Sequence, residues 1–193
     1  MAAAPTREAI TGLILAGGRG QRLGGVDKGL QPWRGRPLVD HALARLGPQV
    51  RTVMISANRN PDAYASRGAR VLADASNDFP GPLAGILAGL RAAATPWLAV
   101  VPCDSPSLPL DLVERLASGV GDRRGAVVQR NERFEPVCCL LSTSLADDLE
   151  RYLADGGRKV EGWVGRHAAP VPFDSAGDAA AFANINTPDD LAT

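Results

Sequence analysis

Short apolar runs alternate with segments that carry apolar residues at helical spacing through the first two-thirds of the chain. Apolar runs that end at glycine, proline or aspartate predict buried strands, and the segments between them predict helices. The expected strands are residues 10–16, 50–56, 69–73, 97–101, 126–129, 137–141 and 168–173, and the expected helices are residues 37–46, 61–67, 83–94, 109–117 and 145–154. The alternation predicts a three-layer α/β fold with a mainly parallel central sheet, in which residues 126–129 and 137–141 form an antiparallel pair.

The size and charge of the chain restrict its partners. A length of 193 residues suits one domain, which we expect to span residues 1–193 with a flexible N-terminal segment at residues 1–9. The 21 basic and 21 acidic residues cancel, so the overall charge predicts neither a nucleic-acid partner nor a membrane surface. No apolar run reaches membrane-spanning length. Three cysteines without a C-x-x-C pair argue against a zinc site and suit a reducing cytoplasm.

The strongest local signal is a glycine-rich loop directly after the first expected strand. Residues 15–24 read Leu-Ala-Gly-Gly-Arg-Gly-Gln-Arg-Leu-Gly. Glycines let backbone N–H groups approach phosphate oxygens, and Arg19, Arg22 and Lys28 would add positive charge at the same place. The loop matches neither the Walker pattern nor the dinucleotide fingerprint. It predicts a site for the phosphates of a nucleotide, and the alternative is a surface loop with solvated arginines.

Two aspartates end expected strands, at the edge of the sheet where open α/β folds bind ligands. Asp104 follows the most apolar strand of the chain, and Asp74 follows the strand at residues 69–73. Mg²⁺ prefers hard oxygen ligands and is often held by one or two carboxylates together with substrate phosphates, so Asp104 is the candidate metal ligand. Either aspartate could instead cap a turn or a helix. Asp27 is next to Lys28 and is interpreted as its salt-bridge partner.

A series of motifs, in this order, resembles the molybdenum cofactor guanylyltransferases. The matching segments are residues 15–18, 22–30, 57–59, 74, 80–85, 102–106 and 184–188, the last of which reads Asn-Ile-Asn-Thr-Pro. The likeness runs from about Ile10 to the end of the chain, and the combination is specific, although many sugar-phosphate nucleotidyltransferases share the first motif. The resemblance implies a Rossmann-like nucleotidyltransferase fold and an enzyme that uses GTP, Mg²⁺ and molybdopterin.

The resemblance also implies roles for individual residues. Lys28, Arg22 and Asp104 would be catalytic, and Asp104 would also hold Mg²⁺. The residues expected to bind GTP are Leu15, Ala16, Gly17, Gly18, Lys28, Ser56, Asp74, Gly81, Gly85 and Asp104. The residues expected to face the molybdopterin are Arg158, Lys159, Asn184 and Asn186. This chain departs from the family at two of these places, because relatives often carry asparagine at the position of Ser56 and Arg-Arg at the position of Arg158-Lys159.

The expected reaction is in-line transfer of GMP from GTP to the terminal phosphate of molybdopterin, with pyrophosphate as the leaving group. A phosphate monoester is already anionic near neutral pH, so no serine, cysteine or histidine nucleophile is required. Lys28 and the loop amides would stabilise the departing pyrophosphate, with Arg22 as a helper. Expected partners are GTP, molybdopterin, and proteins that deliver the cofactor or accept it.

Three alternatives stay open. The cytidylyltransferases that modify the same cofactor typically read Ala-Ala-Gly in the first loop, where residues 15–17 are Leu-Ala-Gly, and they also differ around residues 80–85. Backbone groups at residues 81–85 could complement the pairing edge of guanine. A sugar-phosphate nucleotidyltransferase of the same fold is the second alternative. The third is a GTP-binding or cofactor-binding protein without catalysis, which would release no pyrophosphate.

Overall fold

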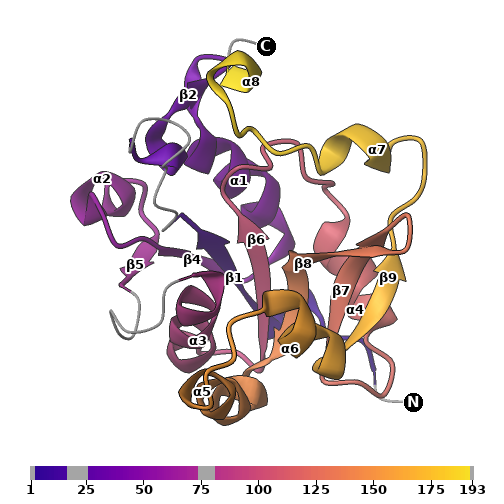
Figure 1. Cartoon of the computed structure of the whole chain (residues 1–193). Coiled ribbons are helices and arrows are strands. Elements are labelled where there is room, and N and C mark those ends of the chain that lie inside the picture. The colour runs from indigo at the N-terminus through magenta and orange to yellow at the C-terminus, as the bar shows by residue number, and fades with distance from the viewer. Residues whose placement is uncertain (1–2, 17–25, 74–80, 192–193) are drawn as a thin grey trace.

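A central sheet organises the computed structural model, which describes residues 3–16, 26–73 and 81–191. Within these residues, seven strands pair in the order β5-β4-β1-β6-β8-β7-β9 (Figure 1). Their bounds are β1 Ile10–Leu15, β4 Thr52–Ser56, β5 Arg70–Leu72, β6 Trp97–Pro102, β7 Gly125–Arg130, β8 Arg133–Ser142 and β9 Ala168–Pro172. Strand β8 is antiparallel to both β6 and β7, and the other pairings are parallel. The predicted α/β fold with a mainly parallel sheet is confirmed.

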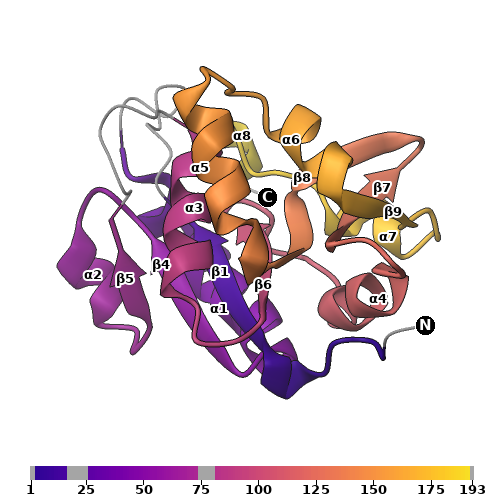
Figure 2. The ribbon, with the colours of Figure 1, turned by 90° about the horizontal axis from the view of Figure 1, so that it is seen from below.

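Helices cover both faces of this sheet and bury two separate apolar clusters. Helices α1 (Leu38–Leu46) and α4 (Leu112–Gly119) contribute to one cluster, together with Ile14 of β1. Helices α3 (Pro82–Ala92), α5 (Ala146–Ala154) and α6 (Val160–His167) contribute to the other. Figures 1 and 2 show these two helical layers with the strands between them. Because both faces are covered, Leu98–Val101 of β6 are all buried, as the continuous apolar run in the sequence requires.

Short elements connect the main ones. They are a small hairpin of β2 (Pro32–Trp33) and β3 (Arg36–Pro37), the helices α2 (Pro61–Ala65), α7 (Asp178–Ala181) and α8 (Pro188–Leu191), and the 3₁₀ turns Arg7–Ala9, Lys28–Leu30, Gly47–Gln49 and Thr143–Leu145. The sequence did not predict the hairpin, α6 or α7. A strand of two residues shows no alternation, and α6 contains two glycines, which lower helix propensity.

Some predicted boundaries also differ from the structure. The helix expected from Pro109 begins only at Leu112. Strand β8 begins at Arg133 instead of Val137. Val127 and Val128 of β7 are paired with Cys139 and Glu135, so residues 136–138 of β8 form an irregularity that accommodates Pro136, and the pairing continues beyond it. The antiparallel pairing of β7 and β8 is as predicted.

The direction of the strands brings distant segments to one edge. Strands β1, β4, β5 and β6 are parallel, so their carboxyl ends lie together. Figure 1 shows the chain after α7 crossing from the β9 side of the molecule to α8, which lies beside β2. This C-terminal segment, residues 183–187, therefore passes over the carboxyl end of β6, where its backbone is bonded to Asp104.

Candidate functional site

Three polar side chains from distant parts of the sequence meet at the carboxyl edge of the sheet. The Lys28 Nζ atom lies 2.6 Å from Asp104 Oδ2 and 2.5 Å from Asn186 Oδ1, and it donates a hydrogen bond to each. The Lys28 and Asp104 side chains are 15% and 22% exposed. The ion pair is therefore largely shielded yet still reachable from solvent, which strengthens its electrostatic interactions relative to a fully exposed pair.

Strand β6 and the C-terminal segment together place Asp104. The Cys103 N–H donates to the Leu15 carbonyl at 3.1 Å, which continues the β1–β6 pairing to the last residue before the aspartate. The Ile185 N–H then donates to the Asp104 carbonyl at 2.9 Å. Next to it, the Ser105 hydroxyl donates to Asn184 Oδ1 at 2.6 Å. Asn184 and Asn186 are thus fixed on either side of a backbone contact with Asp104.

Asp190 holds the second half of the Asn-x-Asn segment. Its Oδ2 atom accepts the backbone N–H groups of Asn186 and Thr187, both at 2.8 Å, and its own N–H donates to the Thr187 hydroxyl. The two backbone N–H donors lower the pKa of the Asp190 carboxyl. This capping arrangement at the start of α8 orients the backbone from which Asn186 reaches Lys28.

Lys28 begins a 3₁₀ turn that is anchored through the preceding residue. Asp27 accepts the Tyr64 hydroxyl at 2.5 Å on Oδ1 and the Asn60 amide at 3.0 Å on Oδ2. Burial, followed by the hydrogen bond to Asp27, raises the pKa of Tyr64, so this hydroxyl stays a donor. The interpretation of Asp27 as the salt-bridge partner of Lys28 is wrong, because Lys28 is paired with Asp104 while Asp27 serves Tyr64 and Asn60.

A second group of expected nucleotide-binding residues lies where β1 and β4 end. Leu15 is paired with Ser56, and the Ala16 N–H donates to the Ser56 carbonyl at 2.8 Å. A Cβ atom on Gly85 would lie 2.6 Å from Ser56 Oγ, so only glycine lets α3 approach the strand ends this closely. Gly81 precedes α3 with a φ of 117°, which other residues rarely adopt. The structure therefore brings Leu15, Ala16, Ser56 and Gly85 together; Ser56 is 2% exposed, and its contact with GTP stays a prediction.

The connection between α5 and α6 carries Arg158 and Lys159. Helix α5 follows β8, which runs opposite to the parallel strands, so α5 ends at their carboxyl edge and α6 begins there. Arg158 Nη1 donates to the carbonyls of Leu153 and Gly157, both at 2.7 Å, and Tyr152 donates to the Lys159 carbonyl. These bonds hold the connection against α5 at the same edge as Lys28.

Four of the expected site residues are outside the described part of the chain: Gly17, Gly18, Arg22 and Asp74. Within the described residues, no group of three or more His, Cys, Asp or Glu side chains is arranged to hold a metal ion. Asp104 is consequently a single-carboxylate candidate there, which is compatible with Mg²⁺ bound mainly by substrate phosphates.

The cysteine nearest the site is a poor nucleophile. Cys103 directly precedes Asp104 and is buried, and its burial, together with the nearby Asp104, raises the pKa of its thiol to about 12. A thiol with this pKa stays protonated near neutral pH and is a poor nucleophile. The expectation that no cysteine attacks the substrate is consistent with this position.

Several supporting residues were not singled out from the sequence. Ser105, Asp190, Tyr64 and Asn60 all bond to the segments that carry the site, but each contact joins residues far apart or depends on a local cap. Only the cap left a recognisable signal, since Thr187 and Asp190 have the spacing of a capping box.

The chain is similar to known proteins over nearly its whole length. Residues 12–170 match the family model described as the MobA-like NTP transferase domain. A molybdenum cofactor guanylyltransferase of Cupriavidus necator is 53% identical over 97% of this chain and 96% of that protein. One of Ralstonia nicotianae is 52% identical over 95% and 94%. The solved structure of a molybdopterin-guanine dinucleotide biosynthesis protein A from Archaeoglobus fulgidus superposes with a TM-score of 0.75, at 26% identity, and covers 94% of this chain and 95% of that one.

Proposed function

The chain belongs to the molybdenum cofactor guanylyltransferases of the MobA-like NTP transferase family, and we propose that it transfers GMP from GTP at the Lys28–Asp104–Asn186 cluster. The acceptor is the terminal phosphate of molybdopterin. Its oxygen attacks the α-phosphorus of GTP, the bond from that phosphorus to the bridging oxygen breaks, and pyrophosphate leaves with the electron pair. The products are the guanine dinucleotide cofactor and pyrophosphate.

One observation carries this proposal: the Lys28 ammonium and the Asp104 carboxylate are 2.6 Å apart at the carboxyl edge of the sheet. Open α/β sheets bind ligands at this edge. The ammonium can bind the phosphates of a metal–triphosphate complex, and the neighbouring carboxylate can bind its metal. Neither residue needs to form a covalent intermediate, because the acceptor is already an anionic nucleophile.

The donor atoms around Lys28 fit a hard divalent cation. Asp104 Oδ2 and Asn186 Oδ1 converge on one ammonium group at 2.6 and 2.5 Å. Carboxylate and amide oxygens are ligands that Mg²⁺ accepts. We assign Asp104 as the Mg²⁺ ligand, and Mg²⁺ bound there would neutralise charge on the phosphates of GTP.

Lys28 contributes charge where the pyrophosphate leaves. In the described state its ammonium is satisfied by Asp104 and Asn186. A bound triphosphate would supply stronger anionic acceptors, so the ammonium can turn from these partners to the phosphates without losing hydrogen bonds. Charge placed in advance at the position of the developing negative charge lowers the barrier.

The two substrates would occupy opposite parts of the same edge. We place GTP against the ends of β1 and β4 and the start of α3, where Gly81 and Gly85 keep side chains out of the way. We place molybdopterin between Asn184 and Asn186 on one side and Arg158 and Lys159 on the other. The acceptor phosphate would then meet the α-phosphate beside Lys28.

The cellular compartment and the protein partners follow from the same proposed reaction. In the described part of the chain, no helix is long and apolar enough to cross a membrane, and all three cysteines are unpaired and buried. We place the enzyme in the cytoplasm, where thiols stay reduced. Proteins that deliver the cofactor or take up the product would be its macromolecular partners.

The decisive experiment measures pyrophosphate release by the purified protein with Mg²⁺, molybdopterin and each of GTP, CTP, UTP and ATP in turn. We expect release only with GTP, and only when both Mg²⁺ and the acceptor are present. Mass spectrometry of the product should show the added GMP.

Controls separate the alternatives. A panel with glucose 1-phosphate in place of molybdopterin tests sugar-phosphate transfer, and release with CTP instead of GTP would identify a cytidylyltransferase. GTP binding without any pyrophosphate release, under conditions in which the acceptor is intact, would contradict catalysis and leave a binding protein.

A further inference from the structure

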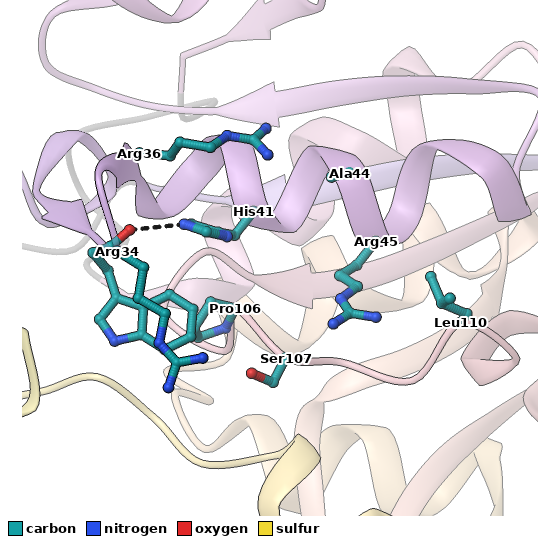
Figure 3. A pocket seen from close by; sticks show the side chains of 9 residues that line it. Arg34, Arg36, His41, Ala44, Arg45, Pro106, Ser107 and Leu110 are labelled. Atoms are coloured by element: carbon teal, nitrogen blue, oxygen red, sulfur yellow. Dashed lines mark hydrogen bonds between the residues drawn. The ribbon is translucent and has the colours of Figure 1, made fainter. Parts of the chain in front are cut away.

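A hollow of about 420 Å³ lies between α1 and the loop that carries Pro106 and Ser107 (Figure 3). It is formed by the β2–β3 hairpin, α1 and the loop that follows Asp104. Its lining residues include Trp33, Arg34, His41, Arg45, Ser107 and Leu110. Trp33 also packs with Leu38 and Ile185, and none of Lys28, Asp104, Asn184 and Asn186 lines the hollow. The hollow is therefore distinct from the Lys28 site.

The charge of this hollow is not balanced within the described part of the chain. Arg34, Arg36 and Arg45 line it, and none of the three guanidinium groups has a described carboxylate partner. Arg36 donates to the Asp40 carbonyl, at 3.5 Å, while the Asp40 carboxylate is paired with Arg67. Three arginines without a described carboxylate partner, in a chain of zero net charge, favour the binding of an anion.

Two of these arginines face one space. Figure 3 shows Arg34 and Arg45 extending toward the open volume beside Ser107, one from the hairpin and one from α1, whereas Arg36 extends away from it. Arg34 is held in position, because its guanidinium lies 4.3 Å from the centre of the Trp33 ring and its backbone takes a φ of 47° in the hairpin turn. Two guanidinium groups and one hydroxyl form a donor set that matches the oxygens of a phosphoryl group.

The other side of the hollow is apolar. Leu110 is 63% exposed, and Ala44 and Pro106 lie in the same lining. Trp33 lines the hollow and is 7% exposed, and its indole N–H has no acceptor among the described residues. A ligand that fits would join an anionic group to an apolar group.

We propose that this hollow is a second binding site, for a phosphate monoester with an apolar or aromatic organic group. Arg34 and Arg45 would hold the phosphoryl oxygens, the Ser107 hydroxyl would bond to one of them, and Leu110 would cover the organic group. The ligand would be bound and not transformed, because the one lining residue that could act as a general base, His41, is bonded through Nε2 to the Trp33 carbonyl at 2.9 Å.

Isothermal titration calorimetry with phenyl phosphate and with inorganic phosphate tests this site. We expect one saturable site, with phenyl phosphate bound more tightly than inorganic phosphate, and the same affinity in Lys28→Ala protein. The double variant Arg34→Gln/Arg45→Gln should bind phenyl phosphate about tenfold more weakly or worse, since charge-assisted hydrogen bonds are lost. Leu110→Ser should weaken the binding of phenyl phosphate and leave the affinity for inorganic phosphate unchanged.

The matched control is Arg51→Gln/Arg70→Gln, which removes the same charge from exposed arginines outside the hollow. Unchanged affinity in this control supports the proposal. Equal weakening in both double variants, equal affinity for the two phosphates, or no saturable binding in the wild-type protein would overturn it. Circular dichroism of each variant checks that the protein is folded.

Discussion

Two aspartate ion pairs link distant parts of the chain, and they are built differently. In the first, Lys28 meets Asp104 through one ammonium contact of 2.6 Å, with Asn186 as the other described partner of the ammonium. In the second, Arg115 of α4 meets Asp178 of α7 through two guanidinium contacts of 2.9 and 3.2 Å. Asp178 also accepts the Ser175 backbone N–H and hydroxyl, and its side chain is 5% exposed.

The difference indicates what each pair is for. The Arg115 pair is saturated: the guanidinium also bonds to the Pro172 carbonyl and lies 3.6 Å from the centre of the Phe173 ring. A planar group fixed from several directions stabilises one arrangement of the chain. A lysine on a flexible stem keeps the freedom to exchange partners. We therefore expect the Lys28 pair to serve ligand binding and catalysis and the Arg115 pair to serve the fold.

The largest effect should come from Lys28→Ala. Loss of a charge donor at the leaving group should lower turnover by about 10²-fold or more, while the midpoint of thermal unfolding changes little. Pyrophosphate release at saturating GTP and calorimetric unfolding measure the two quantities. Near-normal turnover would remove Lys28 from the mechanism and would contradict the different roles assigned to the two ion pairs.

Asp104→Asn should come next. The variant keeps the shape of the side chain but removes the charge that we assign to Mg²⁺ binding. The Mg²⁺ concentration for half-maximal activity should rise by about 10–100-fold or more, because even residues that only support metal ligands contribute about this much to metal affinity, and turnover should fall with it. A magnesium titration of activity decides this, and an unchanged requirement for the metal would place the ligand elsewhere.

Asp178→Asn should have the opposite pattern. Arg115 would lose its charged hydrogen bonds to the buried Asp178 side chain, while its longer contact with the Asp111 carboxylate, at 3.9 Å, would remain. This change should lower the free energy of unfolding by about 1–3 kcal/mol. In a chain of this size that corresponds to roughly 2–4 °C in melting temperature per kcal/mol. Activity at a temperature well below the transition should be unchanged, and a large loss of turnover with normal stability would contradict the assignment.

The smallest effect is a pH dependence of the same pair. The hydrogen bonds from Arg115 lower the pKa of the Asp178 carboxyl in the folded protein, below its usual value of about 3.9 in an unfolded chain. The stability that this carboxylate contributes is therefore present above about pH 4 and lost as the pH falls through the folded pKa. The difference in melting temperature between wild type and Asp178→Asn should shrink below pH 4. A constant difference from pH 7 to pH 3 would contradict this.

Motifs next to strand ends made much of the site predictable. Lys28, Asp104, Asn184 and Asn186 were chosen from the sequence, and the structure brings all four to one edge. The partner of Lys28 was not predictable by adjacency: Asp27, its neighbour in sequence, points to Tyr64 and Asn60 instead. Consecutive residues diverge where the chain turns, so sequence distance is a poor guide to ion pairing.

The hollow lined by Arg34 and Arg45, in contrast, could not be predicted from the sequence. The β2–β3 hairpin has strands of two residues and a turn with positive φ at Arg34 and Gly35, and nothing in its hydrophobic pattern indicates it. Arg34 and Arg45 come together with Ser107 only because the hairpin folds back on α1 and the loop after Asp104 packs beside it.

The sequence by itself determined the alternation of strands and helices, the parallel direction of β1, β4, β5 and β6 and the polar residues expected at their ends, because apolar periodicity and strand-end polarity are local properties. Tertiary structure decided which charges pair, how the Asn-x-Asn segment crosses back over β6, and where arginines without a described carboxylate partner gather. Those features depend on contacts between segments as far apart as Lys28 and Asn186, 158 residues away, and contacts of that range are fixed only when the two helical layers close on the sheet.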